Sequence, residues 1–170
     1  MTRYNHHLSG GTTLYPESMD QIKGVLAELV LQIPDLFVMV TDHAGQNIAW
    51  DGEIGNASLV TLGALIASDM AAGQEIAKVT GEGHVPRMIL HEGDACHQFI
   101  CEAGEALVLF ARVPADTPLG LSRSFIKEAA DSLGKITQES KTRQQMEKAS
   151  LGNQPLKEEI GNALDDLWSR

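Results

Sequence analysis

Four side chains of the kind that bind zinc lie close together in the chain: His91, Cys96, His97 and Cys101. A structural zinc site needs four such ligands with characteristic short spacings. On a β-strand alternate residues share a face, so His97 and Cys101 point to one side and Cys96 points to the other. The spacings match no structural zinc pattern. We therefore expect no metal site, and we interpret these residues as buried or half-exposed strand positions.

The remaining patterns that could do chemistry are incomplete. The glycine-containing segment 81–86, GEGHVP, lacks the lysine and the Ser/Thr of a phosphate-binding loop and does not open a helix directly. Ser58, Ser68 and Ser122 lack the flanking residues of a nucleophile elbow. The sequence thus predicts no catalytic residues and no cofactor, and we expect a protein that is not an enzyme.

Asp69 stands out because it lies within the apolar pattern of a long predicted helix, beside Leu62, Leu65 and Ile66. A carboxylate buried there would need a partner. One interpretation is structural, an ion-paired acid at the edge of the core. The other is functional, a contact to a partner protein. We favour the structural interpretation, because buried polar groups are usually satisfied within the fold.

Composition narrows the class of protein. The chain has 170 residues, enough for about one domain, with 43% hydrophobic and 21% charged residues and a net charge of −10. Such a charge disfavours nucleic acid or an anionic membrane surface as the main partner. The sequence shows no secretory signal and no apolar run long enough to span a membrane. The chain contains only two cysteines, which suits a reducing compartment. We therefore expect a cytoplasmic protein.

The segment around which the other predicted elements are arranged is 56–78, which reads as one proline-free helix with Asn56 as its N-cap. At about 100° per residue, large aliphatic side chains gather on one face, which we expect to lie on a sheet. These are Leu59, Leu62, Leu65, Ile66 and Ile76. The opposite face is small and apolar, so a second copy of the chain could approach closely. We therefore predict a homodimer whose interface contains Val60, Gly63, Ala64, Ala67 and Ala71.

The other elements follow from apolar periodicity and turn residues. A polar tail is expected over 1–16, with solvated histidines at positions 6 and 7. An amphipathic helix should begin at Ser18 and end before Pro34. A further helix is expected after Thr117, with an apolar side running from Leu121 to Ile136. The predicted strands are 36–41, 46–50, 87–92, 95–102 and 105–112.

Antiparallel strand groups with segregated helices predict an α+β sandwich of order αββαβββα. We divide the chain into a flexible tail (1–16), a domain (17–137), a polar helical extension or linker (138–152) and a C-terminal amphipathic helix (153–170). That last helix either packs on its own protein or binds a partner, with Trp168 as the expected anchor. Its apolar positions are Leu156, Ile160, Leu164, Leu167 and Trp168.

This order, with GALIASDMAAGQEIA in the long helix, then MILHEG, then ALVLFARVPADTPLGLSRSFIKEAA, resembles the roadblock/dynein light chain family. The resemblance covers about residues 17–136. Within the family, the chain is similar to the bacterial MglB-like members, which serve small Ras-like GTPases. The resemblance implies a five-stranded antiparallel sheet with helices on both sides, and a homodimer in which the long helices pair and the sheets join.

Two functions are compatible with the sequence, and we favour the first, which the resemblance implies. In the first, the protein is a non-catalytic homodimeric regulator or scaffold of a small Ras-like GTPase, modulating nucleotide hydrolysis or exchange. Arg87, Arg112 and Arg123 could each be imagined as an arginine finger, but nothing singles one out. In the second, it is a structural adaptor in a motor-type or cell-polarity complex, without effect on nucleotide turnover. A ligand-sensing module is a third alternative.

Overall fold

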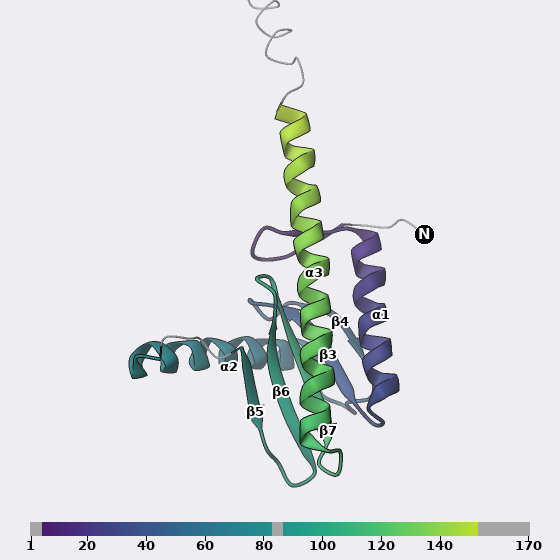
Figure 1. Ribbon diagram of the computed structural model, residues 1–170, viewed down its shortest axis with the longest axis vertical. Coiled ribbons are helices and arrows are strands. Elements are labelled where there is room, and N and C mark those ends of the chain that lie inside the picture. The colour runs from purple at the N-terminus through teal and green to yellow at the C-terminus, as the bar shows by residue number, and fades with distance from the viewer. Residues whose placement is uncertain (1–4, 83–86, 153–170) are drawn as a thin grey trace, which may run out of the picture.

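The computed structural model describes residues 5–82 and 87–152 of the chain. Within them the chain folds as an α+β sandwich with three helices and a five-stranded sheet (Figure 1). The elements are β1 (His6–His7), β2 (Thr13–Leu14), α1 (Pro16–Gln32), β3 (Phe37–Asp42), β4 (Asn47–Asp51), α2 (Leu59–Thr80), β5 (Met88–His91), β6 (Cys96–Ala103), β7 (Leu107–Pro114) and α3 (Leu119–Gly152). The predicted fold class is therefore confirmed.

The large sheet is antiparallel throughout, in the order β4-β3-β7-β6-β5. Its inner strand β3 is an uninterrupted run of buried residues, FVMVTD, because both faces of the sheet are covered there. Tight connections pair β3 with β4 and make a meander of β5, β6 and β7, as the turn residues predict. The two edges of this sheet are β4 and β5.

The helices lie in two layers. Figure 1 shows α1 and α3 side by side over one face of the sheet, while α2 crosses the other face and its C-terminal half extends past the β5 edge. The larger core lies under α1 and α3. The smaller core lies under α2 and contains Phe37, Met39, Ile66, Met70, Ile100, Val108 and Phe110.

Two helix starts differ from the prediction. Helix α2 begins at Leu59 rather than 56, because the Ser58 hydroxyl, not the Asn56 side chain, accepts the Thr61 backbone N–H at 3.3 Å. Helix α1 begins at Pro16, before Ser18. The Ser18 side chain is buried and exchanges a hydrogen bond of 2.8 Å with Ser140 of α3, so it ties two helices together rather than capping one.

The prediction of a flexible tail is wrong for residues 5–15. Strands β1 and β2 form a small antiparallel hairpin, and Leu8 and Leu14 are buried members of the larger core. The histidines are not simply solvated either, since the His7 ring lies 3.1 Å from the Thr13 hydroxyl. Glycine and polar residues suggested disorder here because the apolar partners that bury Leu8 and Leu14 lie far away in the sequence.

The polar segment after Ile136 continues α3 without a break to Gly152. Its middle is held by the N-terminal segment: the Tyr15 hydroxyl donates to the Glu147 carboxylate at 2.6 Å, and the Arg143 guanidinium lies 3.9 Å above the Tyr15 ring. The hydrogen bond to Glu147 is the main cause that raises the pKa of Tyr15 above its ordinary value. The Thr13 backbone N–H also donates to the side-chain oxygen of Gln144 at 3.3 Å. These contacts explain why a sequence that alone would be a marginal helix is helical.

A buried carboxylate organises the β3–β4 turn. Asp42 accepts backbone N–H groups from Ser9 at 2.9 Å, Ala44 at 3.0 Å and Gln46 at 2.9 Å. Burial alone would raise the pKa of Asp42, but these hydrogen bonds outweigh it and the pKa lies below its ordinary value. One side chain thus joins the N-terminal hairpin to the turn.

The same turn touches α2 through two glycines. Gly45 has a φ of +81°, and a Cβ built on it would lie 2.5 Å from the carbonyl oxygen of Gly63. A Cβ on Gly63 would in turn overlap the carbonyl oxygen of Gly45. The helix backbone therefore rests directly on the turn, which only glycine on both sides permits.

We expect Gly63→Ala to destabilise the protein by about 2 kcal/mol, because overpacking outweighs the gain in helix propensity. The measurement is the free energy of unfolding in urea. Gly24→Ala on α1, where an added Cβ meets nothing within 4 Å, is the matched control and should be neutral or stabilise by up to about 1 kcal/mol. Equal effects of the two substitutions would contradict the backbone contact.

Asp42→Asn should destabilise the protein at neutral pH by about 1–3 kcal/mol, because the buried N–H groups lose a charged acceptor. A carboxyl whose folded pKa is lowered stabilises the fold above its unfolded pKa, and this is lost as pH falls through the folded pKa. Unfolding at a series of pH values should therefore show the gap between wild type and Asp42→Asn narrowing below about pH 4. Asp116→Asn, at an exposed position, serves as control. A gap that widens in acid would refute this account.

Candidate functional site

The outer side of α2 is an apolar surface without a partner among the described residues. Large aliphatic side chains on it are strongly exposed: Val60 at 79%, Leu65 at 62%, Ile76 at 63% and Val79 at 86%. Exposed alanines lie between them, and the polar residues of the same side are few. Surfaces of this kind mark sites of protein association. We call it the outer α2 face, defined by Val60, Ala64, Leu65, Ala71, Ile76 and Val79.

The residues predicted for the dimer interface divide between two environments. Val60, Ala64 and Ala71 are exposed on the outer α2 face, and Ala67 is half-buried beside it. Gly63 is buried and packs on Gly45, so its assignment to a surface between two copies is corrected. A small residue on a helix permits close approach of any backbone, and here the approaching backbone belongs to the same chain.

The predicted bulky inner face is also partly corrected. Leu59, Leu62 and Ile66 pack on the smaller core, together with Met70. Leu65 and Ile76 were expected there but face solvent. A helix that is apolar all round does not reveal which side is inside. The signal that could have found the outer side was the polar set Thr61, Ser68 and Glu75, which shares it.

Asp69 lies at the border between these two sides and has a partner within the protein. Its carboxylate is 2.5 Å from Nε2 of His91 on β5, so the pair ties α2 to the edge of the sheet. This agrees with the structural interpretation of Asp69. Because both side chains are substantially exposed, we assign the pair a positioning role rather than a large contribution to stability.

Two hollows flank α2. One, of about 510 Å³, lies between the helix and the turns that follow β3 and β6. It is lined by His43, Ala67, Met70, Ala71, Gln74, Glu102, Gly104 and Glu105. The other, of about 360 Å³, lies where the chain enters α2, and is lined by Trp50, Gly52, Glu53, Ile54, Gly55, Ala57 and Leu59. The outer α2 face thus forms a ridge, and the two hollows are the depressions beside it.

Trp50 is a contact candidate that the sequence did not indicate. It is 54% exposed on the edge strand β4, although it follows Ile48 by two residues, a spacing that places both side chains on one face of a regular strand. Ile48 is buried. The register with β3 is irregular between Val40 and Thr41. Tryptophans are enriched at interaction hot spots, so Trp50 is the candidate anchor for a partner in the second hollow.

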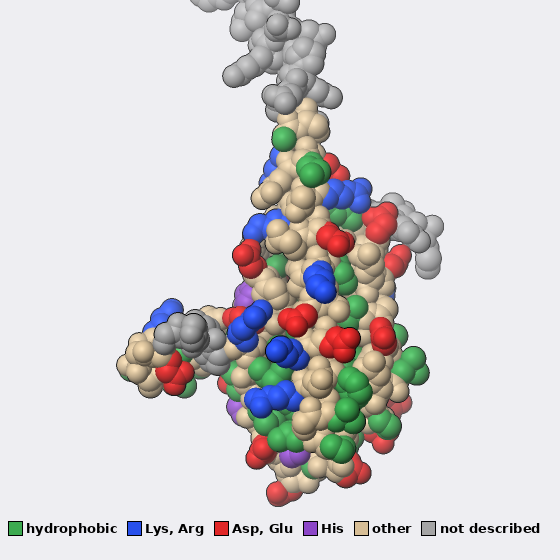
Figure 2. Space-filling view, in the orientation of Figure 1, with side chains coloured by type: hydrophobic (Ala, Val, Ile, Leu, Met, Phe, Trp, Pro, Cys, Tyr) green, Lys and Arg blue, Asp and Glu red, His purple; other side chains and the backbone are tan. Residues whose placement is uncertain are grey.

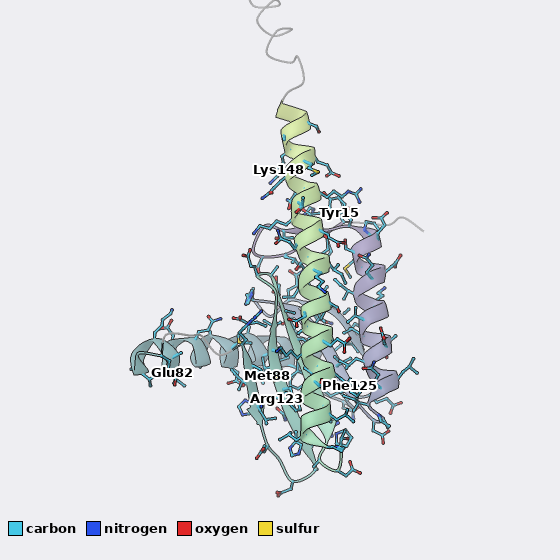
Figure 3. The ribbon with its side chains drawn as sticks, in the orientation of Figure 1. Tyr15, Glu82, Met88, Arg123, Phe125 and Lys148 are labelled. Carbon is cyan, nitrogen blue, oxygen red and sulfur yellow. The ribbon has the colours of Figure 1, made fainter. Side chains whose placement is uncertain are left out.

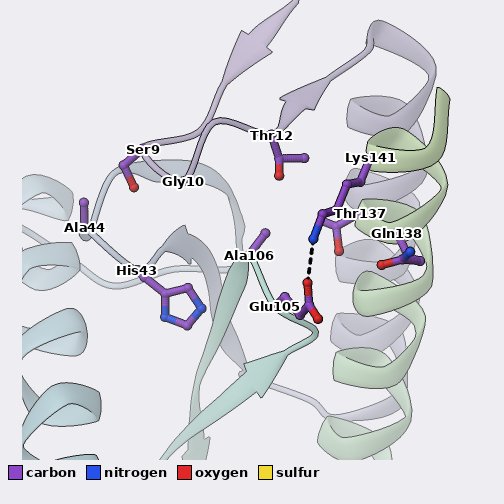
Figure 4. A pocket seen from close by; sticks show the side chains of 10 residues that line it. All are labelled: Ser9, Gly10, Thr12, His43, Ala44, Glu105, Ala106, Thr137, Gln138 and Lys141. Atoms are coloured by element: carbon purple, nitrogen blue, oxygen red, sulfur yellow. Dashed lines mark hydrogen bonds and ion pairs between the residues drawn. The ribbon is translucent and has the colours of Figure 1, made fainter. Parts of the chain in front are cut away.

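A third hollow, of about 390 Å³, lies between the loop of the N-terminal hairpin, the β3–β4 turn and α3 (Figure 4). Ser9, His43 and Gln138 present polar groups to it. Its one ammonium group, from Lys141, is neutralised by Glu105 at 2.7 Å, which lowers the pKa of Glu105 through the hydrogen bond. Its size and lining leave the ligand-sensing alternative open.

The cysteine and histidine residues weighed as zinc ligands all lie on two neighbouring strands, His91 on β5 and the other three on β6. In residues 5–82 and 87–152, no group of three His, Cys, Asp or Glu side chains is arranged to hold a metal ion. Cys96 and Cys101 are free thiols. The predicted partner-binding residues Leu156, Ile160, Leu164, Leu167 and Trp168 lie outside the described residues, so that assignment stays a prediction.

Solved structures with the same architecture are roadblock-type proteins. MglB of Myxococcus xanthus is 31% identical over 75% of this chain and 95% of its own, with a TM-score of 0.69. An MglB with a tetrameric arrangement is 28% identical over 79% of this chain and 99% of its own, with a TM-score of 0.71. A Roadblock/LC7 domain from Streptomyces avermitilis shares the fold at 17% identity, with a TM-score of 0.59 over 65% of this chain and 92% of its own.

No family model matches the sequence, and no curated protein matches it either. The sequence identity to the Myxococcus protein, over nearly all of that protein's length, is nevertheless sufficient to assign the family. This chain belongs to the MglB-like branch of the roadblock/dynein light chain family. In the part of the chain that the structure describes, no helix combines the length and apolarity that crossing a membrane requires.

Proposed function

We propose that this protein is a non-catalytic, homodimeric regulator or scaffold of a small Ras-like GTPase. The observation that carries the proposal is the outer α2 face, an exposed apolar ridge on a chain of net charge −10. Membership of the MglB-like branch supports it. Such a surface suits association with proteins, whereas no described arrangement of side chains suits covalent chemistry.

The dimer would form through α2. Ala64 and Ala71 allow the backbones of two helices to approach closely, while Leu65, Ile76 and Val79 supply the apolar area that a stable interface needs. The β5 edge beside the projecting half of α2 could extend the sheet into the second copy. The tetrameric arrangement of one MglB supports self-association as a property of related chains.

The GTPase would bind in the hollows beside α2, with Trp50 as an anchor on one side. Regulators of this class act by ordering the mobile switch loops of the GTPase, so they need shape and polar complementarity rather than a nucleophile. No arginine is assigned as a finger: Arg112 is half-buried on β7, and Arg87 and Arg123 lie on the other side of the sheet, near α3.

Ala64→Arg should convert the dimer to a monomer, because a bulky charge would be placed in the centre of an apolar interface. The measurement is molar mass by light scattering across a range of concentrations. Ala27→Arg, at an exposed position of α1 on the opposite face of the sheet, is the matched control and should leave the mass unchanged. A monomeric wild type, or a dimeric Ala64→Arg, would refute the α2 interface.

Binding to a small Ras-like GTPase of the same genome should depend on the nucleotide. We expect the GTP-analogue form to be retained by the immobilised protein and the GDP form to be lost, because only the former has ordered switch loops. A chain ending at Ser150 tests the predicted C-terminal helix: loss of binding would assign residues 151–170 to the partner. Trp50→Ala should weaken binding about tenfold or more if it is a hot spot.

The second candidate is a structural adaptor without effect on nucleotide turnover. It would use the same outer α2 face, which by itself does not distinguish a regulator from a scaffold. Equal binding of both nucleotide forms, or dimerisation without any GTPase binding, would favour the adaptor over the regulator.

A further inference from the structure

A separate cavity of about 300 Å³ lies on the side of the sheet opposite α2, between α3 and the edge strand β5. It is at the small end of the range for ligand pockets. Three of its seven lining residues are basic, in a chain with only 13 lysines and arginines. The lining residues are Arg87, Met88, Cys101, Glu102, Arg123, Lys127 and Asp131.

The walls of the cavity come from two rigid elements. Arg123, Lys127 and Asp131 follow one another at intervals of four along α3, so they form one row of the helix surface. Met88 and Cys101 are cross-strand partners on β5 and β6 and form the apolar floor. Figure 3 labels Met88 and Arg123, and in that view they lie next to each other beside α3.

The three basic side chains are not neutralised within the described residues. Lys78, Lys141 and Arg143 each have a carboxylate oxygen within 2.6–3.5 Å. In residues 5–82 and 87–152, Arg87, Arg123 and Lys127 have neither an ion pair nor a side-chain hydrogen bond. Figure 2 shows blue side chains over α3 and the adjoining sheet edge, with red side chains among them.

The acidic groups at the cavity do not neutralise these three basic side chains. The Glu102 carboxylate accepts a hydrogen bond of 3.0 Å from the Gln74 amide, which belongs to α2. Asp131 is four residues C-terminal to Lys127, the less favourable order for a helical ion pair, and its carboxylate is not within ion-pair distance of Lys127 among the described contacts. The basic groups are therefore free to bind an anion from outside.

The floor stays uncharged at neutral pH. Burial raises the pKa of the Cys101 thiol to about 11, with the nearby Asp131 carboxylate acting in the same direction and Arg87 and Lys127 opposing it. A neutral thiol beside a methionine offers a soft apolar surface. A group bound here would find an apolar base and a rim of guanidinium and ammonium donors.

We propose that this cavity is a binding site for a small organic anion that carries a carboxylate or phosphate on an apolar body about the size of one aromatic ring. Arg87 and Arg123 would grip the acidic group from opposite rims, since guanidinium forks match planar carboxylates and phosphates. Lys127 adds a third donor, and Met88 and Cys101 receive the apolar body. This site does not depend on the proposed GTPase regulation, and α2, the helix altered in the dimer test, contributes no residue to its lining.

The test is a titration of the isotopically labelled full chain with phenyl phosphate, followed by backbone amide resonances. We expect saturable shifts centred on Met88, Cys101 and Arg123. Inorganic phosphate, which lacks the body, and benzyl alcohol, which lacks the charge, should both bind at least tenfold more weakly. Equal binding of inorganic phosphate, or shifts scattered over the surface, would overturn the proposal.

Substitutions of the cavity residues are expected both to weaken and to strengthen the affinity for phenyl phosphate. Arg123→Gln and Lys127→Gln should each weaken phenyl phosphate binding about tenfold, because each removes a charged hydrogen bond. Asp131→Asn should strengthen it several-fold by removing a repelling carboxylate from the rim. Lys23→Gln, at an exposed position of α1, is the control and should change nothing. An unchanged affinity in Arg123→Gln and Asp131→Asn would refute the site.

The anion could also be the side chain of a partner protein. The tripeptide acetyl-Glu-Phe-Glu-amide, titrated in the same way, separates the two sources. Weaker binding of the peptide than of phenyl phosphate supports a small-molecule site. Tighter binding of the peptide would overturn that assignment in favour of an acidic segment of a protein.

Discussion

The contact between the backbones of Gly45 and Gly63 decides how α2 lies on the sheet. Because neither residue has a side chain, the helix rests on the β3–β4 turn itself, and this determines which of its apolar sides faces inward. Ile66 and Met70 follow Gly63 into the smaller core. Leu65 and Ile76 are thereby turned to solvent, and the outer α2 face exists as a consequence.

The β3–β4 turn also connects α2 to the N-terminal hairpin. Asp42 holds the turn from within and accepts the backbone N–H of Ser9, so the hairpin loop and the α2 contact share one support. The hairpin and the residue that follows it bind the extended half of α3 through Tyr15, Arg143 and Glu147. A continuous set of contacts thus runs from α2 through the turn to the C-terminal half of α3, on opposite sides of the sheet.

The two sides of the sheet divide the surface by chemistry. The α2 side offers an apolar ridge with hollows on both flanks, which suits a protein partner. The α1/α3 side offers a small cavity with basic side chains that are not neutralised within the described residues, which suits an anion. Such separation would allow both to be occupied at once, because the first hollow beside α2 and the basic cavity share only Glu102 among their lining residues.

The five strands of the large sheet, the three helices and the order αββαβββα could be predicted from the sequence, because strand and helix periodicities and turn residues are local properties. The buried run of β3 and the meander from β5 to β7 are examples. The C-terminal residues from Leu156 to Trp168 remain a sequence-based prediction.

What the tertiary structure alone decided depends on contacts between distant residues. The sequence predicted that Gly63 leaves room for a second copy of the chain, but in the structure the backbone of Gly45 occupies that space. The sequence predicted a flexible tail for residues 5–15, because the core that buries Leu8 and Leu14 is built from segments that are remote in the chain. Arg87 and Arg123 share one cavity only because β5 lies beside α3. Periodicity shows that a side chain has apolar neighbours on its helix, but only packing shows what lies opposite it.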